Sequence, residues 1–384
     1  MAHPSSAAIE SSRHFKQRRY SAMRILYLGD DNQFCTSAHR ASALIRLGHE
    51  VVFLNPRAIL PGWPIVGGIS TRIGFWPFVP LVGASLRRKI GARVFDLAWV
   101  DGGSALSPGF HRFLLSHCSR IVNYNCDDPF GGRDHNKWNL YLRSVPYHDL
   151  TIVMRDLNIK EAQAAGAKRI ARVYMSYDPV VHFPVDPNEI ERSRLASEVV
   201  FIGAWMPERG SFLLRLIEEG VPLAIWGPRW QKAPEYARLR PAIRGSAMLG
   251  ADYVKTIRCA KIALGMLSKG NRDEHTQRSV EIPFIGGAAF CAERTKEHEA
   301  MYSNESEAAF WSSPEECAAK CKELLGDSRK RKALVQKAHA RVVALGLSND
   351  DVMRALVEAL GRTDRVLRWK IDHGKLFPMS PEEL

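Results

Sequence analysis

The chain has 384 residues, of which 46% are hydrophobic and 25% are charged. This composition excludes a largely disordered protein, and the length exceeds what one hydrophobic core usually spans, so two domains are predicted. The formal net charge of +13 favours anionic partners, although the absence of any zinc-finger, helix-turn-helix or RNP-like pattern makes nucleic acid unlikely as one of them.

The amino-terminal residues 1–22 carry no continuous apolar stretch of the kind that a secretory signal needs, so we expect a disordered basic tail. The seven cysteines are odd in number and scattered, without a CxxC pair or a histidine cluster at metal-ligand spacing. Reduced thiols in a cytoplasmic protein are the simplest interpretation, and no metal site is predicted.

Strands and helices alternate through the first half of the chain. A strand at 24–29, a helix at 38–47 and a strand at 50–54 form a unit that requires a right-handed crossover between parallel strands. The pattern continues with strands at 95–100, 120–125, 150–154 and 172–174 and a helix at 107–117. We therefore predict a Rossmann-like domain over residues 23–188.

The longest apolar stretch, residues 61–84, interrupts this alternation. Its four prolines and Arg72 argue against a membrane-spanning helix. We expect a loop whose aromatic residues either pack in the ordinary way or present an apolar surface to an acceptor or a lipid; these are Trp63, Phe75, Trp76 and Phe78.

A second α/β series follows a polar linker at 186–197 and predicts another Rossmann-like domain over residues 189–346. Its strands are expected at 198–203, 222–226, 262–266 and 287–291, and its helices at 211–219 and 251–258, with helical periodicity over 314–345. Ser348 can cap a further helix, so residues 347–384 are predicted as a carboxy-terminal helix and tail.

Ligands of parallel sheets collect beyond the carboxyl ends of the strands, so the loops there hold the candidate residues. The first loop lacks a GxGxxG fingerprint, which disfavours a dinucleotide oxidoreductase. Asp127 and Asp128 end a predicted strand, where a carboxylate could deprotonate an acceptor hydroxyl or stabilise an oxocarbenium-like transition state. The alternative for this pair is an Asx-type turn before Pro129. His39 is a third catalytic candidate, and its alternative is a helix-terminal or core position.

The most informative segment is DEHTQRSVEIPFIGGAAFCAE, residues 273–293, in which seven residues separate Asp273 from Glu281 and a Gly-Gly turn leads into a strand. It resembles the donor-binding segment of GT-B glycosyltransferases with a family-1/4-like carboxy-terminal domain, and most closely that of CgeB-type (spore-maturation) proteins. The run FIGAWMPERGSFLLRLIEEGVPLAIWGPRW is a second match, and the resemblance spans about residues 24–345.

The resemblance implies an α/β GT-B fold, in which two Rossmann-like parallel-sheet domains face a cleft and carboxy-terminal helices follow. It implies that a nucleoside-diphosphate sugar is bound by a helix that begins near Thr276. The positions that match the family's donor site are Arg209, Gly227, Asp273, Thr276, Gln277, Arg278 and Glu281.

The implied roles follow the chemistry of these side chains. The backbone N–H groups of Thr276 and Gln277, with Arg278 or Arg209, would hold the diphosphate, while Glu281 would bind the ribose. Asp273 would contact the transferred sugar, and Gly227 would form a turn. Simpler alternatives are a helix-capping acid with a solvated helix residue for the acidic pair, and a surface salt bridge for Arg209.

The implied activity is hexosyl transfer to a glycan, lipid-linked or protein acceptor in cell-envelope polysaccharide synthesis, with UDP favoured as the nucleotide. The resemblance further implies no bound metal, no cofactor besides the nucleotide-sugar co-substrate, and retention rather than inversion at the anomeric carbon. The alternatives are a non-catalytic nucleotide-sugar or glycan-binding protein and a GT-B-type nucleotide-sugar epimerase. A cytoplasmic enzyme that visits the anionic inner membrane fits the basic charge.

Overall fold

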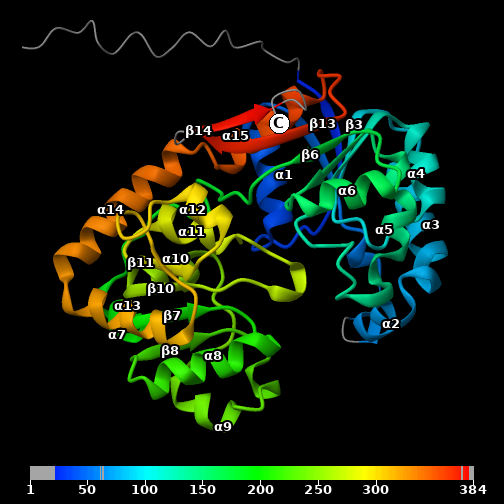
Figure 1. Cartoon of the computed structure of the whole chain (residues 1–384). Coiled ribbons are helices and arrows are strands. Elements are labelled where there is room, and N and C mark those ends of the chain that lie inside the picture. The colour runs from blue at the N-terminus through cyan, green and yellow to red at the C-terminus, as the bar shows by residue number, and fades with distance from the viewer. Residues whose placement is uncertain (1–21, 61, 63–64, 373–374, 380–384) are drawn as a thin grey trace, which may run out of the picture.

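The computed structural model describes residues 22–60, 62, 65–372 and 375–379, so the predicted basic tail lies outside the described residues except for Ala22. Two α/β units follow one another along the chain, each built on its own parallel sheet (Figure 1). This arrangement confirms the predicted fold class.

The first sheet has eight strands in the order β14-β13-β6-β5-β4-β3-β1-β2, and all pairings are parallel except that of β13 with β14. Its central strands are buried on both faces, which explains their nearly continuous apolar sequences. The strands are β1 (Arg24–Leu28), β2 (Glu50–Leu54), β3 (Phe95–Asp101), β4 (Cys118–Tyr124), β5 (Leu150–Val153), β6 (Ile170–Arg172), β13 (Val366–Asp372) and β14 (Lys375–Met379). The helices of this part are α1 (Thr36–Arg46), α2 (Ile65–Ile73), α3 (Val79–Ile90), α4 (Pro108–Leu115), α5 (Asn139–Ser144) and α6 (Leu157–Ala164), with short 3-10 turns η2 (Arg57–Ile59), η3 (Trp76–Phe78), η4 (His135–Trp138) and η5 (Val145–Tyr147).

The second sheet has six parallel strands in the order β12-β11-β10-β7-β8-β9. They are β7 (Ser197–Ile202), β8 (Leu223–Trp226), β9 (Ile243–Gly245), β10 (Ala260–Gly265), β11 (Ala289–Glu293) and β12 (Ala309–Trp311). The helices are α7 (Glu189–Leu195), α8 (Pro207–Glu218), α9 (Tyr236–Leu239), α10 (Gly250–Arg258), α11 (Arg278–Ile285), α12 (Lys296–Met301), α13 (Pro314–Gly326) and α14 (Ser328–Ala344), with 3-10 turns η6 (Trp230–Lys232), η7 (Arg240–Ala242) and η8 (Lys269–Asn271).

The end of the chain returns to the first sheet. Ser348 caps α15 (Asn349–Ala359) as predicted, since its hydroxyl accepts a hydrogen bond from the N–H of Asp351. Helix α15 packs against α1, and its Met353 and Leu356 are buried in the core of the first sheet. Strand β13 then pairs with β6. Residues 347–384 were predicted as a helix and tail, so the strands β13 and β14 were not predicted.

The strand orders fix where ligands can bind. In the first sheet the order around the start is β2-β1-β3, and in the second it is β8-β7-β10, so the chain reverses its direction of winding between β1 and β3 and between β7 and β10. The loops after these strand pairs diverge to opposite faces and leave a crevice at the carboxyl edge. Each sheet therefore has one topological switch point.

The apolar stretch at 61–84 is helical over much of its length rather than a loop. Helices α2 and α3 flank the 3-10 turn η3, and Pro77 and Pro80 occupy early positions of η3 and α3, where a missing N–H costs little. Phe75 is fully buried and Trp76 is exposed, whereas Trp63 lies outside the described residues. None of the helices in the described part of the chain combines the length and the apolarity that crossing a bilayer requires.

Candidate functional site

A cavity of about 130 Å³ lies at the switch point of the first sheet. Gly102 and Gly103 form its floor after β3, and both have positive φ, which favours glycine. A Cβ on Gly103 would also lie 2.9 Å from the Val100 side chain. Further lining comes from the loops after β1 and β4, at Gly29, Asp30, Asn125, Cys126 and Asp127.

The two predicted catalytic acids have different environments. Asp127 lines the cavity and makes no ion pair within the described residues. The carboxylate of Asp128 is fully buried and accepts hydrogen bonds from Arg272, at 2.8 Å from Nη2, and from Asn158. Burial alone would raise the pKa of Asp128, but the hydrogen bonds from Arg272 hold it below its ordinary value.

The Asx turn considered for this segment is also present. Asn125 accepts a hydrogen bond from the N–H of Asp127 at 3.0 Å, and Asp128 accepts one from the N–H of Phe130 at 3.2 Å. Asp128 therefore has structural partners on all sides, whereas Asp127 is the acid that the loop presents to the cavity.

Two of the residues that line this cavity, Arg40 and Asp101, form a buried ion pair. Arg40 in α1 binds both carboxylate oxygens of Asp101 at the end of β3, at 2.7 and 2.9 Å, and the Tyr27 hydroxyl donates to the same carboxylate. The side chains of Arg40 and Asp101 are 2% and 8% exposed. Burial would lower the pKa of Arg40, but Asp101 raises it well above its ordinary value, so the pair is ionised and locally neutral.

The second switch point also holds a buried arginine, the predicted donor residue Arg209 in the first turn of α8. It donates to the carbonyl of Ala204 after β7 at 2.9 Å and to that of Leu267 after β10 at 3.2 Å, and it lies over the Phe201 ring. No carboxylate pairs with it among the described residues. Burial lowers its pKa, and its Nε has no partner in the described part of the chain.

Helix α11 begins at Arg278, two residues after the predicted start. Thr276 and Gln277 precede it, and their side-chain oxygens are buried without a partner within the described residues. The N–H of Thr276 donates to the Ser279 hydroxyl, and those of Ser279 and Val280 donate to the carbonyls of Thr276 and Gln277, so Thr276 does not offer the predicted donor. Within the described residues, the N–H groups of Gln277 and Arg278 are the ones left for an anion at this end of α11.

Glu281 is the centre of a buried polar cluster in the same helix. Arg278 donates to its carboxylate at 2.5 Å, Tyr253 donates at 2.8 Å, and Nε2 of His182 lies 3.5 Å from it. Burial would raise the pKa of Glu281, but the charge of Arg278 holds it below the ordinary value. His39 approaches this cluster from the first domain, stacking edge-on against His182.

Asp273 lies where the two domains meet. It accepts from Arg155, which follows β5 in the first domain, at 2.9 Å from Nε, and Arg155 also donates to the carbonyl of Cys126 in the cavity wall. Burial raises the pKa of Asp273, and Arg155 only partly offsets this effect. The neighbouring Arg272 reaches back to Asp128 and Glu161. Arg155 thus bridges Cys126 in the wall of the first cavity and Asp273 of the donor segment.

Glycine is required at position 227 because the backbone of another loop lies too close for a side chain. A Cβ at this position would lie 1.9 Å from the carbonyl oxygen of Gly203 and 2.5 Å from its carbon. The loops after β7 and β8 therefore approach each other more closely than any side chain would permit.

Sequence reasoning missed Arg155, Arg272, Tyr253 and His182. Arg155 immediately follows a strand, so the strand-end argument applied to Asp127 would have identified it. Tyr253 and His182 are far from Glu281 in sequence, and no local pattern predicts that they converge on it.

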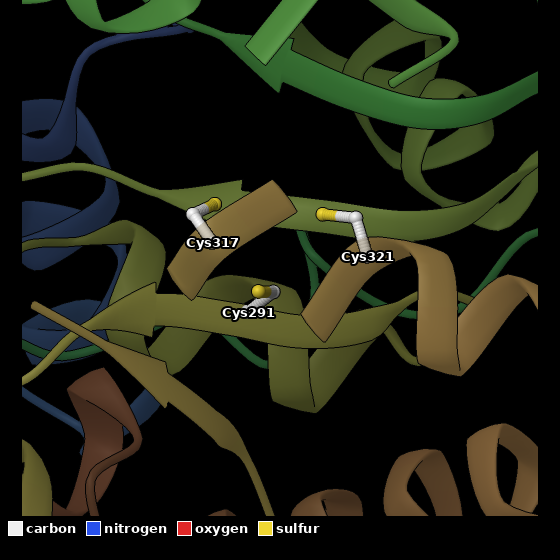
Figure 2. A group of neighbouring side chains, drawn as sticks. All are labelled: Cys291, Cys317 and Cys321. Atoms are coloured by element: carbon white, nitrogen blue, oxygen red, sulfur yellow. The ribbon is translucent and has the colours of Figure 1, made fainter. Parts of the chain in front are cut away.

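One cluster capable of holding a metal occurs among the described residues, and it was not predicted. Cys291 of β11 and Cys317 and Cys321 of α13 bring their sulphur atoms within 4.8 Å of one another (Figure 2). All three are fully buried among apolar side chains, an ordinary setting for free cysteine. Hydrogen bonding to the neighbouring thiols and burial raise the pKa of Cys291. The cluster shares no residue with the cavity, and Cys291 alone of the three belongs to the segment 273–293.

Known proteins resemble this chain both in sequence and in structure. Residues 209–358 match the family model described as "Glycosyl transferase-like". Sucrose-phosphate synthase from Thermosynechococcus elongatus is similar with a TM-score of 0.64 and 10% identity, over 87% of this chain and 98% of that one. The chain has the GT-B glycosyltransferase fold.

Other structures with this fold carry ligands or different activities. Anabaena HepE in complex with UDP-glucose gives a TM-score of 0.58 at 11% identity, over 88% of this chain and 99% of that one. A UDP-N-acetylglucosamine 2-epimerase from Listeria monocytogenes, itself described as putative, gives 0.55 at 13% identity, over 90% and 98%. The comparison with curated protein sequences gave no match. The residues matched by the family model include the predicted donor residues Arg209 and Asp273 and the helix α11.

Proposed function

We propose that the protein transfers a hexosyl group from a nucleoside-diphosphate sugar, with UDP favoured, to a hydroxyl of a glycan, lipid-linked or protein acceptor. The observation that carries this proposal is the contact between the two switch points. Arg155 binds both the wall of the Asp127 cavity and Asp273 of the donor segment. A donor held by the second domain would therefore present its sugar beside the cavity of the first.

The second switch point suits a diphosphate. Arg209 forms no ion pair within the described residues, and the N–H groups of Gln277 and Arg278 and the dipole of α11 add to its positive charge. HepE and the E. coli trehalose-6-phosphate protein bound UDP-glucose and UDP-2-fluoro-glucose in this fold, which supports UDP. Glu281, already held by Arg278 and Tyr253, would bind the ribose hydroxyls through its remaining lone pairs.

The transfer step breaks the bond between the anomeric carbon and the diphosphate oxygen and forms a bond from that carbon to the acceptor oxygen. In an inverting reaction, the Asp127 carboxylate takes the acceptor proton. In a retaining reaction, which the resemblance favours, the proton passes to the leaving diphosphate and Asp127 stabilises the oxocarbenium-like transition state. NMR of the anomeric proton of the first-formed product distinguishes the two.

The proposed chemistry needs neither a metal nor a cofactor besides the donor, because Arg209, Arg278 and the α11 dipole would balance the diphosphate charge. Chelator treatment checks this point, with unchanged turnover as the expected result. A cytoplasmic location and a role in envelope polysaccharide synthesis rest on the resemblance and stay predictions.

Two alternatives use the same donor site. Epimerisation has specific support from the Listeria structure and would act on the donor alone. A non-catalytic binding protein would have no use for an acid at the domain interface, yet Asp127 lines the cavity and Asp128 contacts the second domain. Incubation with donor alone, followed by NMR of the sugar, would reveal an epimer if the first alternative holds.

The test is a calorimetric and thermal-shift screen against UDP, GDP, ADP, TDP and their common sugars. We expect saturable binding of one nucleotide-sugar, weakened at least tenfold by Arg278→Ala, because a charge-assisted hydrogen bond contributes about 1.5 to 3 kcal/mol. Arg215→Ala is the matched control, since this arginine lies on the exposed face of α8. Binding of no nucleotide by the folded wild-type protein would contradict the proposal.

A further inference from the structure

Three exposed apolar side chains occur close together in sequence, where α2 ends and α3 begins. Ile73, Trp76 and Leu81 are 55%, 41% and 49% exposed, although they lie within nine residues of one another, and Pro77 and Pro80 beside them are exposed as well. We call these five residues the apolar tip. Soluble monomers rarely expose such a concentration of large apolar groups unless the surface meets a partner.

The segment that carries the apolar tip has charged side chains of one sign. Between Glu50 and Asp96 the chain has six arginines and lysines and no acidic residue. Arg72, Arg88 and Lys89 are exposed and form no ion pair within the described residues. Arg143 adds another cation, which lies over the ring of Trp76 at 4.9 Å. The acid Asp134, which precedes the η4 turn packed on α2, is paired with Arg133 and Lys137. The net positive charge of this surface favours an anionic partner.

Helix α3 arranges apolar and cationic side chains along one of its faces. Leu81 and Arg88 are seven residues apart and so project from the same face of the helix, with the exposed Ala84 between them. This face is apolar at its beginning and cationic at its end. Helix α3 lies at the outer edge of the first domain, away from the second domain (Figure 1).

We infer that the apolar tip and its cations dock on an anionic lipid bilayer. Tryptophan and short aliphatic groups insert at the depth of the headgroups, while arginine and lysine pair with the lipid phosphates. A nucleic acid would satisfy the cations but would leave Ile73 and Leu81 exposed. A second copy of the chain would bring two cationic surfaces together. The inference is independent of the proposed function, because it concerns a surface outside the donor site.

The experiment is co-sedimentation of the full chain with vesicles of phosphatidylglycerol and phosphatidylcholine, compared with phosphatidylcholine alone. We expect binding only to the anionic vesicles. The triple substitution R72Q/R88Q/K89Q should lower the partition coefficient about a hundredfold, since each cation near the surface contributes about 1 kcal/mol. The substitutions W76S/L81S should lower it at least tenfold, and Trp76→Phe should retain most of the binding.

The matched control is R329Q/K332Q/K337Q, which removes the same charge from exposed positions of α14 in the second domain. Residues 1–21 are present in every variant, so they cannot cause a difference between them. Equal losses in the two triple variants would show attraction by net charge alone and would overturn the inference. So would binding that survives W76S/L81S, or self-association through this surface in the absence of lipid, measured by sedimentation velocity. Unchanged circular dichroism and urea midpoints establish that each variant is folded.

Discussion

The two switch points of the molecule are built alike and charged differently. Each places one buried arginine beneath the loops that follow its central strands, Arg40 in the first domain and Arg209 in the second. Arg40 is neutralised by both oxygens of Asp101, whereas Arg209 contacts two backbone carbonyls and the Phe201 ring and forms no ion pair within the described residues. The carboxyl edge of the first sheet therefore has a neutral buried ion pair and an acid, Asp127. The carboxyl edge of the second sheet has a buried positive charge. The difference teaches that the partner of one buried arginine sets the charge of its edge, and under the proposed function it would favour the diphosphate at the second edge.

The largest expected effect concerns the acidic edge. Asp127→Asn keeps the shape of the cavity lining and removes the carboxylate, so the transfer rate should fall about 100- to 10,000-fold, the usual contribution of a positioned general base or charge stabiliser. Donor affinity should be unchanged, because the donor belongs to the other edge. Product formation by chromatography and donor binding by calorimetry measure the two quantities. Unimpaired transfer would remove Asp127 from the chemistry.

The second prediction tests the buried Arg40–Asp101 ion pair of the first domain. Arg40→Met leaves the Asp101 carboxylate buried with only the Tyr27 hydroxyl, and breaking a buried pair in this way costs about 3 to 5 kcal/mol in the free energy of unfolding. Urea denaturation measures it. Arg24→Met in the same sheet is the control, because the Arg24–Glu50 pair is exposed and should contribute about 1 kcal/mol or less. Equal costs would mean that the buried pair has no special role.

Much of this comparison was accessible from the sequence, but its decisive part was not. The alternation of apolar strands with helices predicted both sheets, and the spacing of Asp273 and Glu281 pointed to α11. The strands β13 and β14 were missed because their place beside β6 depends on a long-range return of the chain. The start of α11 at Arg278 and the roles of Asp127 and Asp128 depend on tertiary contacts, since Arg272 and Asn158 bind Asp128 and not Asp127. Likewise, nothing local to Arg40 or Arg209 reveals whether a carboxylate pairs with it.

A third prediction tests the positive edge. Arg209→Met should weaken nucleotide-sugar binding about 10- to 100-fold, because a charged donor near the diphosphate is lost, while the free energy of unfolding changes less than for Arg40→Met. No carboxylate is left unpaired by this substitution; only the Ala204 and Leu267 carbonyls lose a donor. Calorimetry and urea denaturation separate the two effects, with Arg215→Met on the same helix as control. A stability loss without an affinity loss would show that Arg209 only braces the loops.

The smallest expected effect concerns the contact between the edges. Arg272 of the second domain donates to Glu161 of the first at 2.8 Å, and both side chains are about one third exposed, at 34% and 31%. A double-mutant cycle of Arg272→Ala with Glu161→Ala should give a coupling of about 1 kcal/mol in the free energy of unfolding, as expected for a partly buried pair in a network. The exposed Arg354–Asp351 pair within α15 is the comparison and should couple by about 0.5 kcal/mol or less. If the two cycles give the same small value, the contact does not hold the domains together in solution. The contacts of Arg155 with Asp273 and of Arg272 with Asp128 would then be the ones that join the acidic and positive edges, because both involve buried carboxylates.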